Sequence, residues 1–452
     1  MTAENNKRIT IDTPVRFSDP LPKKADVVII GGGVIGVFSA LYLAEMGKSV
    51  VLCEKGRIAG EQSSRNWGWI RQHGRDAAEL PIMMQALRLW HEANERTGGQ
   101  CGVKTGGAYY LASSQKSMAE CEAWLSIAKT QGLDSRMYSA REVSDLCGPY
   151  AKYPWLGGAG TSSDARGEPW RAVPAVAVLA KDAGVTIREN CAVRTLDRAG
   201  GTITGIVTEH GSIACEQVVL AGGAWSSLFA RRHGVDIPQL SVRSTVAQTA
   251  PMPDFANGNF ADESLAFRRR EDGGFSIALG DRSGFFPGPD AFRHFGVYLE
   301  VMRKSWKEIE FHLAGTHLYP DGWRTPRLWK ATEETPFERM RVLEPTPDAK
   351  HVELMVRRFA ERFPDLGRPK ILESWAGMID VMPDVVPIVD RAPDLPGLVI
   401  ATGMSGHGFG IGPGFGRVVA RMVAGQEAEH DLSRFRFNRF TDGSKLEVGS
   451  SL

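Results

Sequence analysis

The sequence lacks a surplus of charge of either sign. Its 54 lysines and arginines balance 53 aspartates and glutamates, which leaves a formal net charge of +1 over 452 residues. Without a basic excess the chain has no general electrostatic attraction to nucleic acid or to an anionic membrane, so we expect neither as a partner. Hydrophobic residues account for 42% and charged residues for 24% of the chain, and these shares exclude a disordered or fibrous protein.

The sequence also lacks the cysteine and histidine spacings of metal sites and of disulfide-rich domains. Six cysteines lie far apart without a CxxC motif, and ten histidines form no HxxxH or HExxH pair. We therefore expect no metal ion. Scattered cysteines in a chain long enough to fold without disulfides are typical of a reducing compartment, so we expect a cytoplasmic protein.

No long hydrophobic run passes through the chain without interruption. Residues 27–44 are uncharged and long enough to suggest a membrane helix, but three consecutive glycines, at 31–33, interrupt them. A buried strand that ends at glycines and opens into a helix explains both halves of the run, so we expect no integral membrane segment. Residues 1–24 are polar and interrupted by proline, so we expect a surface arm and not a secretory signal.

The sequence does contain a dinucleotide-binding pattern near its start. Residues 26–30 are typical of a buried parallel strand, and Gly31, Gly33 and Gly36 follow as a GxGxxG motif that opens a helix. Gly31 permits the tight turn, Gly33 admits a pyrophosphate at the helix N-terminus, and Gly36 lets the helix pack on the strand. The next strand ends at Glu54, whose carboxylate can accept hydrogen bonds from a ribose diol. The motif alone does not separate FAD from NAD.

Later segments carry a family resemblance. They are the loop GEQSSRNWGWIR at 60–71, the strand and glycine turn VVLAGGAWS at 218–226, and two late segments, WAGMID at 375–380 and TGMSGHGF at 402–409. Their order over residues 25–425 resembles the D-amino-acid oxidase superfamily of flavoproteins, in its glycine oxidase and sarcosine oxidase branch. An iminodiacetate oxidase-like enzyme is one form that the resemblance allows.

The resemblance implies FAD in an extended pose. Its adenine half is expected at the first glycine turn and Glu54, and its isoalloxazine near residues 64–68 and 403–408. The cysteine that carries the flavin in monomeric sarcosine oxidases corresponds to Gly377, so we expect non-covalent binding. Motif and resemblance together predict these FAD-binding residues: Gly31, Gly33, Val34, Ile35, Gly36, Glu54, Lys55, Ser63, Ser64, Asn66, Trp67, Gly68, Val193, Gly222, Trp225, Gly403, Gly406, His407 and Gly408.

The implied fold is a Rossmann-like α/β FAD-binding domain interleaved with an α+β substrate domain, which is built on a mostly antiparallel sheet. We assign residues 25–95, 157–235 and 370–430 to the FAD-binding domain, 96–156 and 236–369 to the substrate domain, 1–24 to the arm and 431–452 to a tail. Strand candidates for the substrate domain are 241–250, 265–270 and 275–280. An apolar stretch, 416–423, predicts a helix whose positive end points back at the late glycine loop.

In this family a hydride equivalent passes from the carbon beside an amine to flavin N5, and water hydrolyses the resulting imine. A cation must then hold the substrate carboxylate. Arg71 is the candidate because, counted from Ser63, it matches the substrate-binding arginine of sarcosine oxidases, and a guanidinium can hold both carboxylate oxygens. His407 resembles the flavin-side histidine of the GHG element, and we expect it to position the flavin.

Two cations of the family pattern are missing. The lysine that often follows GHGF is Gly410 here, and the arginine of the glycine oxidase WAGLRP pattern is Ile379. We predict Arg268 and Arg282 as replacements. If Arg71 and Arg282 both face the flavin, a substrate with two carboxylates, such as iminodiacetate, fits the site.

The leading interpretation is an FAD enzyme that oxidises the C–N bond of a small amino acid, with a secondary amine of the sarcosine, glycine or iminodiacetate type and O2 as the expected oxidant. The lysine that promotes the oxygen reaction falls near Ala278, so a D-amino-acid or proline-type dehydrogenase that feeds a quinone or carrier stays open. A flavin-binding electron-transfer subunit is the third alternative. Residues 295–345 are rich in aromatic and basic side chains, which favours an active-site cover or a subunit contact over an acceptor-docking surface. The sequence does not indicate the oligomeric state.

Overall fold

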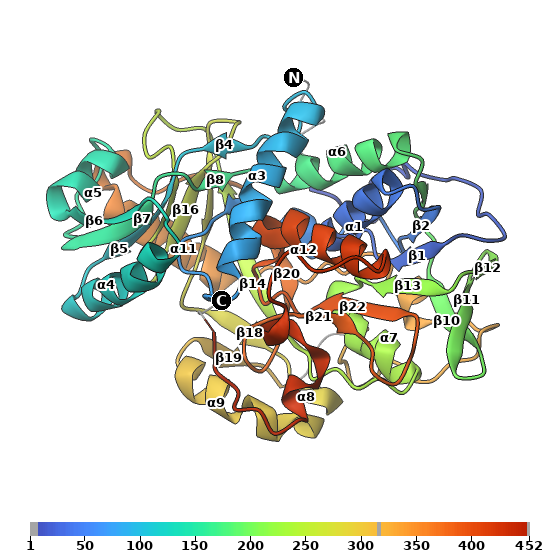
Figure 1. Ribbon diagram of the computed structural model, residues 1–452. Coiled ribbons are helices and arrows are strands. Elements are labelled where there is room, and N and C mark those ends of the chain that lie inside the picture. The colour runs from blue at the N-terminus through green and yellow to red at the C-terminus, as the bar shows by residue number, and fades with distance from the viewer. Residues whose placement is uncertain (1–7, 314–317, 450–452) are drawn as a thin grey trace.

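The computed structural model describes residues 8–313 and 318–449 and has the mixed α/β architecture that the sequence predicts. A six-stranded sheet and a ten-stranded sheet form the two halves of the described chain, and two three-stranded sheets accompany them (Figure 1). The three-stranded sheet β10 to β12 lies at one end of the molecule, while α4 and α5 lie at the other. The predicted domain boundaries stay a prediction.

The six-stranded sheet is mostly parallel. Its order is β21 (Ile388–Arg391), β22 (Leu398–Thr402), β13 (Gln217–Leu220), β1 (Val27–Ile30), β2 (Val50–Cys53) and β9 (Thr186–Arg188). β1 pairs in parallel with both β2 and β13, whereas β21 runs antiparallel to β22. The sequences VVII and VVLC of β1 and β2 are apolar throughout because both faces of these strands are covered. Gly31 and Glu54 follow these two strands and therefore meet at one edge of the sheet.

Helices cover one face of this sheet, and a smaller sheet covers the other. The covering helices are α1 (Val34–Glu45), α3 (Leu80–Arg96), α6 (Pro169–Asp182) and α12 (Gly408–Val423). Opposite them lie α7 (Ser226–Arg232), β10 (Val193–Ala199), β11 (Thr202–Thr208) and β12 (Gly211–Ala214). In Figure 1, α1 lies between α6 and α12, in contact with both. Separate hydrophobic clusters on the two faces hold the layers together.

The ten-stranded sheet is mostly antiparallel, as predicted. Its strands are β19 (Ile309–Phe311), β18 (Ser283–Phe285), β14 (Leu240–Thr249), β17 (Phe275–Ala278), β16 (Ala266–Arg269), β15 (Asn259–Ala261), β5 (Ala108–Ala112), β7 (Gly157–Thr161), β6 (Ser135–Ser139) and β20 (Ile371–Val381), which pairs with β14. The three strand candidates correspond to β14, β16 and β17, with ends that differ by one or two residues. A cluster rich in buried phenylalanines packs α11 (Ala349–Arg362) against this sheet.

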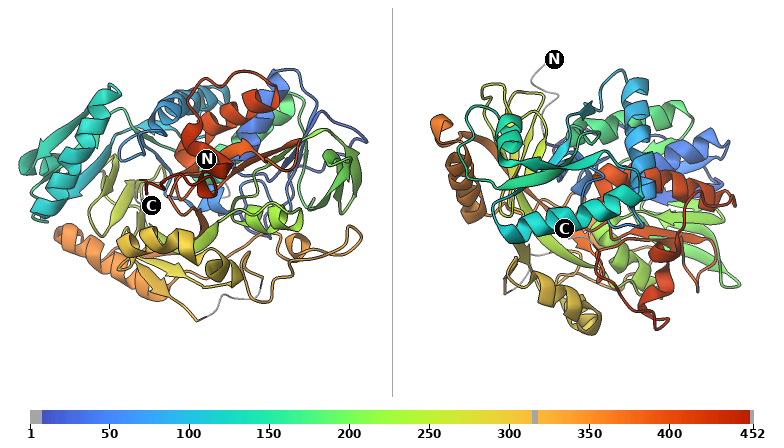
Figure 2. Two further views of the ribbon diagram at one scale, coloured as in Figure 1. Left: turned by 60° about the horizontal axis from the view of Figure 1, so that its bottom comes forward. Right: turned by 60° about the vertical axis from the view of Figure 1, so that its left-hand side comes forward.

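The remaining elements surround these two sheets. They are α2 (Gln62–Arg65), α4 (Gln115–Thr130), α5 (Ala140–Cys147), α8 (Pro289–Arg293), α9 (Phe295–Ser305), α10 (Pro336–Arg339), and the small sheet of β3 (Trp69–Ile70), β8 (Ala165–Arg166) and β4 (Lys104–Thr105). Figure 2 shows α8 and α9 at the periphery, away from α1 and α12. None of the described helices is both long enough and apolar enough to cross a bilayer.

The late helix differs from the prediction. It begins at Gly408, not at residue 416, and it contains Pro413. Proline has no N–H to donate to the carbonyl four residues earlier, which here belongs to Phe409. The indole N–H of Trp90 donates to that carbonyl at 3.1 Å, and to the Gly410 carbonyl at 3.0 Å, so the helix continues through the proline. The helix N-terminus therefore lies at the GHG segment itself.

Replacing Trp90 with phenylalanine should lower the free energy of unfolding by about 1–3 kcal/mol, because the buried Phe409 carbonyl loses a donor that the backbone cannot replace. Urea denaturation measures this difference. Trp306→Phe is the control, since Trp306 is 60% exposed, and it should change stability by less than about 0.5 kcal/mol. Equal stability of the two variants would contradict this account of the helix.

Candidate functional site

A cavity of about 1110 Å³ lies between the two large sheets. Residues at the ends of β1, β2 and β13 line one part of it, and residues of β14, β16 and β20 line another. Phe295, Tyr298 and Met302 of α9 also line it. This contact supports the predicted role of the region 295–345 as a cover, although residues 314–317 lie outside the described residues.

The first glycines form a tight cradle at one end of the cavity. Gly31 has a φ of +111°, and a Cβ atom there would lie 2.4 Å from the Ala221 carbonyl oxygen. At Gly36 a Cβ atom would lie 2.0 Å from the Gly31 carbonyl oxygen, so the helix rests directly on the turn. Gly33 is the N-cap of α1 and has no side chain that could accept from the first N–H groups; the first of these groups donates to the Ser63 hydroxyl at 2.9 Å. The next N–H groups at this helix N-terminus suit a phosphate.

Glu54 borders the same end of the cavity. Its two carboxylate oxygens accept hydrogen bonds from the N–H groups of Gly32 and Gly56, each at 2.7 Å. Loss of solvation raises the pKa of this carboxyl group to about 7, against the lowering effect of Lys55 and of the two N–H donors. The fixed carboxylate retains acceptor capacity for hydroxyl groups of a bound sugar.

The cavity wall contains most of the predicted FAD-binding residues. Those that line it are Gly31, Gly33, Val34, Ile35, Glu54, Lys55, Ser63, Asn66, Trp67, Val193, Gly222, Trp225, Gly406, His407 and Gly408. Four others, Gly36, Ser64, Gly68 and Gly403, lie outside the lining. They serve close packing instead: for example, a Cβ atom at Gly403 would lie 2.3 Å from the Met382 side chain.

Arg71 lines the cavity at its other end, among aromatic rings. One guanidinium nitrogen donates to the His73 carbonyl at 2.5 Å, and the guanidinium carbon lies 5.7 Å from the centre of the Tyr110 ring. The His73 ring stacks between Tyr110 and Trp124, at centroid distances of 4.6 and 4.0 Å. Burial, aided by the Arg71 charge, lowers the pKa of His73 to about 3, so this ring is neutral.

His407 reaches the cavity from the N-cap of α12. Its Nδ1 lies 3.2 Å from a carboxylate oxygen of Glu79, and both side chains are buried. Burial lowers the pKa of His407 to about 4, and the Arg75 charge adds to this shift while Glu79 opposes it. The imidazole is therefore neutral at pH 7. Both ring nitrogens are buried, and neither has the geometry of a hydrogen bond with a described residue.

The buried neutral imidazole predicts a pH-dependent stability. The unfolded chain binds a proton at the ordinary pKa of 6.5, but the folded protein binds it only near pH 4. Stability should therefore be lost as the pH falls from 6.5 to 4, by about 3 kcal/mol at most. Denaturation of the wild type and of His407→Gln across this range measures the effect. A stability difference between the two that does not change with pH would contradict a neutral buried His407.

Two predicted replacement cations do not line the cavity. Arg268 is fully buried, and its guanidinium forms two hydrogen bonds, at 3.0 and 3.2 Å, with the carboxylate of Glu168. Arg282 is half-exposed and pairs with Glu310 at 3.0 Å. Each cation already has a carboxylate partner outside the cavity. The cavity lining therefore does not bring Arg71 and Arg282 together, so the expectation of a dicarboxylate substrate, which depended on that arrangement, gains no support.

The structure adds cavity residues that the sequence did not single out. Glu61 accepts hydrogen bonds from the Trp225 indole and the Lys55 ammonium group, at 3.0 and 2.5 Å. Asp380 accepts the Gly403 N–H at 2.9 Å. Arg75 lies in the loop between β3 and α3. A cation four residues after Arg71 is the only sequence signal that pointed to Arg75, and by itself it is weak.

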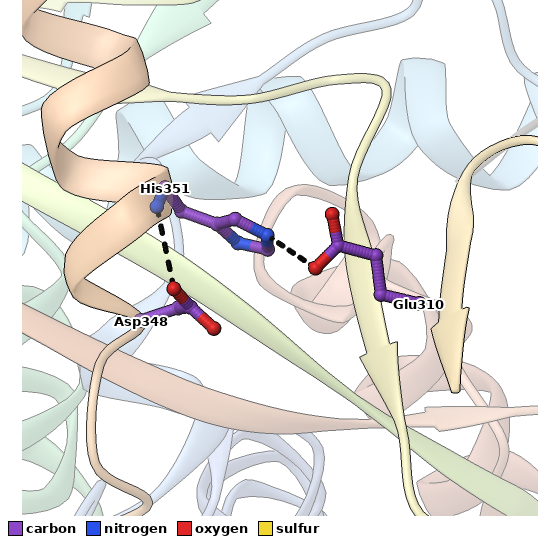
Figure 3. Close-up of side chains that lie close together, drawn as sticks. All are labelled: Glu310, Asp348 and His351. Atoms are coloured by element: carbon purple, nitrogen blue, oxygen red, sulfur yellow. Dashed lines mark hydrogen bonds and ion pairs between the residues drawn. The ribbon is translucent and has the colours of Figure 1, made fainter. Parts of the chain in front are cut away.

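A separate cluster outside the cavity has the atoms of a cation site. Single ligand atoms of Glu310, Asp348 and His351 all lie within 4.8 Å of one another, and His351 points at Glu310 across 2.9 Å (Figure 3). The cluster was not predictable from sequence spacing, because β19 supplies Glu310 while α11 and its N-cap supply the other two residues from a distant position in the chain. Arg282 and Arg243 already pair with the two carboxylates, at 3.0 and 2.8 Å. The cluster therefore acts as an ion-pair network between β19 and α11.

Comparison with known proteins assigns the family. Residues 26–422 match the family model DAO, FAD dependent oxidoreductase. The chain is 26% identical over 439 residues to the sarcosine oxidase subunit beta of an Arthrobacter species, covering 95% of both chains. It is 25% identical to the glycine oxidase of Bacillus subtilis, over 92% of this chain and 97% of that one.

A solved structure is similar over nearly the whole chain. It is the L-amino acid deaminase from Proteus myxofaciens in complex with anthranilate, with a TM-score of 0.90 and 30% identity over 96% of this chain and 98% of that one. The fold, the residues that line the cavity and the family match all indicate the same family. The chain belongs to the DAO family of FAD-dependent oxidoreductases.

Proposed function

We propose that this protein uses FAD to oxidise the C–N bond of an amino acid that carries a free carboxylate. One observation carries the proposal: a single cavity contains both the dinucleotide cradle and Arg71, a cation with no carboxylate partner among the described residues. A cation at a cavity wall without a counter-ion suits an anionic substrate group. The relatives whose names include sarcosine, glycine and amino acid act on molecules that share an amine and a carboxylate.

The residues present fit FAD. Gly31 and Gly33 leave room for a pyrophosphate beside the N–H groups of α1, and Glu54 would accept hydrogen bonds from the ribose. Gly377 lines the cavity and offers no atom for a covalent bond, which supports non-covalent binding. The N-terminus of α12, at Gly408, would stabilise negative charge in the redox-active half of the cofactor.

A bound FAD would supply the acceptor for a hydride equivalent from the carbon beside the amine, and water would hydrolyse the resulting imine. The protein must orient that carbon and favour the uncharged amine. Arg71 would hold the carboxylate and so fix the orientation. The positive charges of Arg71 and Arg75 lower the pKa of an ammonium group bound nearby, which favours its uncharged form. The neutral His407 lines the same cavity.

A small secondary amino acid of the sarcosine type remains the first substrate class to test, with O2 as the proposed oxidant and the cytoplasm as the proposed location. Anaerobic addition of candidate amines should bleach the flavin absorbance of the FAD-loaded protein. Readmission of air then separates the oxidants: rapid return of the colour with peroxide supports an oxidase, and slow return favours a dehydrogenase. If no secondary amine, D-amino acid or L-amino acid bleaches the flavin, the proposal is wrong and an electron-transfer subunit explains the fold better.

A further inference from the structure

Arg75 is a buried cation that forms no ion pair within residues 8–313 and 318–449. Its side chain is 3% exposed and lines the cavity. Nε donates to the Arg71 carbonyl at 3.2 Å, and Nη2 donates to the His407 carbonyl at 3.4 Å. Nη1 has no partner, and no carboxylate of the described residues lies within ion-pair distance of the guanidinium. Two weak contacts to backbone carbonyls do not neutralise the charge.

The guanidinium of Arg75 lies where the family pattern leads one to expect another cation. The sequence has Gly410 at the position that often carries a lysine. A Cβ atom built at Gly410 would lie 3.1 Å from the Trp69 carbonyl oxygen and 3.3 Å from Nη2 of Arg75. A longer side chain at residue 410 would therefore compete for the space that Arg75 occupies. Glycine at position 410 thus leaves room for the Arg75 guanidinium.

Neither arginine at this end of the cavity forms an ion pair with a described carboxylate. The acid that acts most strongly on the Arg75 charge is the buried Glu79, whose carboxylate lies 3.2 Å from His407 and does not contact Arg75. Asp164, the other acid nearby, accepts hydrogen bonds from Gln72 and His73, and burial raises its pKa to about 7. Burial also lowers the pKa of Arg75 to about 9, and the Arg71 charge adds to the effect while Glu79 and Asp164 oppose it. An anion bound between the arginines would offset this cost.

We propose that Arg75 binds the substrate carboxylate together with Arg71 and supplies the cation that residue 410 lacks. The inference rests on the proposed function and extends it by naming a second carboxylate ligand. A purely structural role explains the bonds of Nε and Nη2, which hold the loop between β3 and α3, but it leaves the buried Nη1 of this cavity-lining residue without a partner. Aromatic rings of Trp67, Trp69 and Tyr110 line the same region and suit a flat ligand.

Benzoate binding to the FAD-loaded protein tests the proposal without turnover, and benzamide is the probe of equal shape without charge. Dissociation constants come from the change in flavin absorbance and from the rise in melting temperature. The wild type should bind benzoate more tightly than benzamide. Arg75→Met should weaken benzoate binding about 10- to 100-fold and leave benzamide unchanged. The matched control Arg282→Met, which removes an arginine outside the cavity, should change neither constant.

Two results would overturn the proposal: a wild type that does not prefer benzoate, or an Arg75→Met variant that binds benzoate as the wild type does. If Arg75→Met fails to fold, Arg75→Lys takes its place, because it keeps the charge and loses the two-pronged geometry. It should weaken benzoate binding about 3- to 10-fold and leave benzamide unchanged. The double variant Arg75→Met/Gly410→Lys should recover part of the benzoate affinity, which a structural role of Arg75 does not predict.

The benzoate experiment and the amine screen together distinguish a failure of the Arg75 proposal from a failure of the proposed function. If no amine bleaches the flavin but Arg75→Met binds benzoate more weakly than the wild type, the result supports the anion site and contradicts amine oxidation. If amines bleach the flavin and Arg75→Met binds benzoate as the wild type does, the result supports amine oxidation and contradicts the role of Arg75 as a carboxylate ligand.

Discussion

A valine in place of Gly33 should yield a folded protein that binds FAD at least about 100-fold more weakly, a loss of about 2.7 kcal/mol. Gly33 has ordinary extended backbone angles, φ −76° and ψ 178°, so a branched side chain does not strain the chain itself. A Cβ atom there would meet only the Ser63 hydroxyl, at 3.2 Å. The new methyl groups would stand in the cavity, where the pyrophosphate must approach the N–H groups of α1.

The flavin absorbance per purified chain, and a titration of flavin-free protein with FAD, measure this loss. Gly296→Val is the matched control because Gly296 is exposed on α9, and a Cβ atom there meets nothing within 4 Å. The control should bind FAD as the wild type does. A Gly33→Val variant that stays fully loaded with flavin would place the pyrophosphate elsewhere and remove the basis for the cofactor site.

Arg71→Ala should lower kcat/KM for the amino-acid substrate by a factor of about 10² to 10³, which corresponds to about 3–4 kcal/mol of lost interaction. Arg71 lines the cavity, and within the described parts of the chain its guanidinium donates to a carbonyl oxygen, lies near the Tyr110 ring and pairs with no carboxylate. The carboxylate of the substrate would be its charged partner. FAD content should stay unchanged, since Arg71 is not among the residues predicted to hold the cofactor.

Steady-state kinetics with the purified variant measure the loss, and Arg282→Ala is the control. Arg282 pairs with Glu310 outside the cavity, so its removal should change kcat/KM by less than about twofold. A large loss in Arg282→Ala with no loss in Arg71→Ala would reverse the assignment and restore the arrangement that the sequence alone suggested.

The cofactor half of the site was predictable because its signals are local. The strand, the glycines and the start of the helix lie within one stretch of sequence, and backbone geometry dictates glycine at Gly31 and Gly36. The position of Glu54 beside the glycine turn was predictable for the same reason, because the parallel strands β1 and β2 end at the same edge of the sheet. These features do not depend on distant segments.

The cations of the substrate half were not predictable to the same degree. The sequence does not indicate which acid pairs with Arg268 or Arg282. Their partners, Glu168 and Glu310, come from segments distant in the chain. The opposite holds for Arg75: its neighbours Asp76 and Glu79 look like partners, but neither pairs with it in the folded chain. Whether a charge is neutralised depends on tertiary contacts, which spacing in the sequence does not reveal. The start of α12 differed for the same reason, because the donor to Phe409 is a tryptophan from α3.

The central claim is that one cavity brings a carboxylate-bearing amine to a bound flavin. The most direct test is the rate at which the flavin of the FAD-loaded protein is reduced, without oxygen, by the best amino acid found in the screen and by its carboxamide. The account predicts rapid bleaching by the amino acid and reduction slower by a factor of about 10² or more by the carboxamide, whose neutral end gives the arginines no charge to hold. Equal rates of reduction by the two compounds would contradict it.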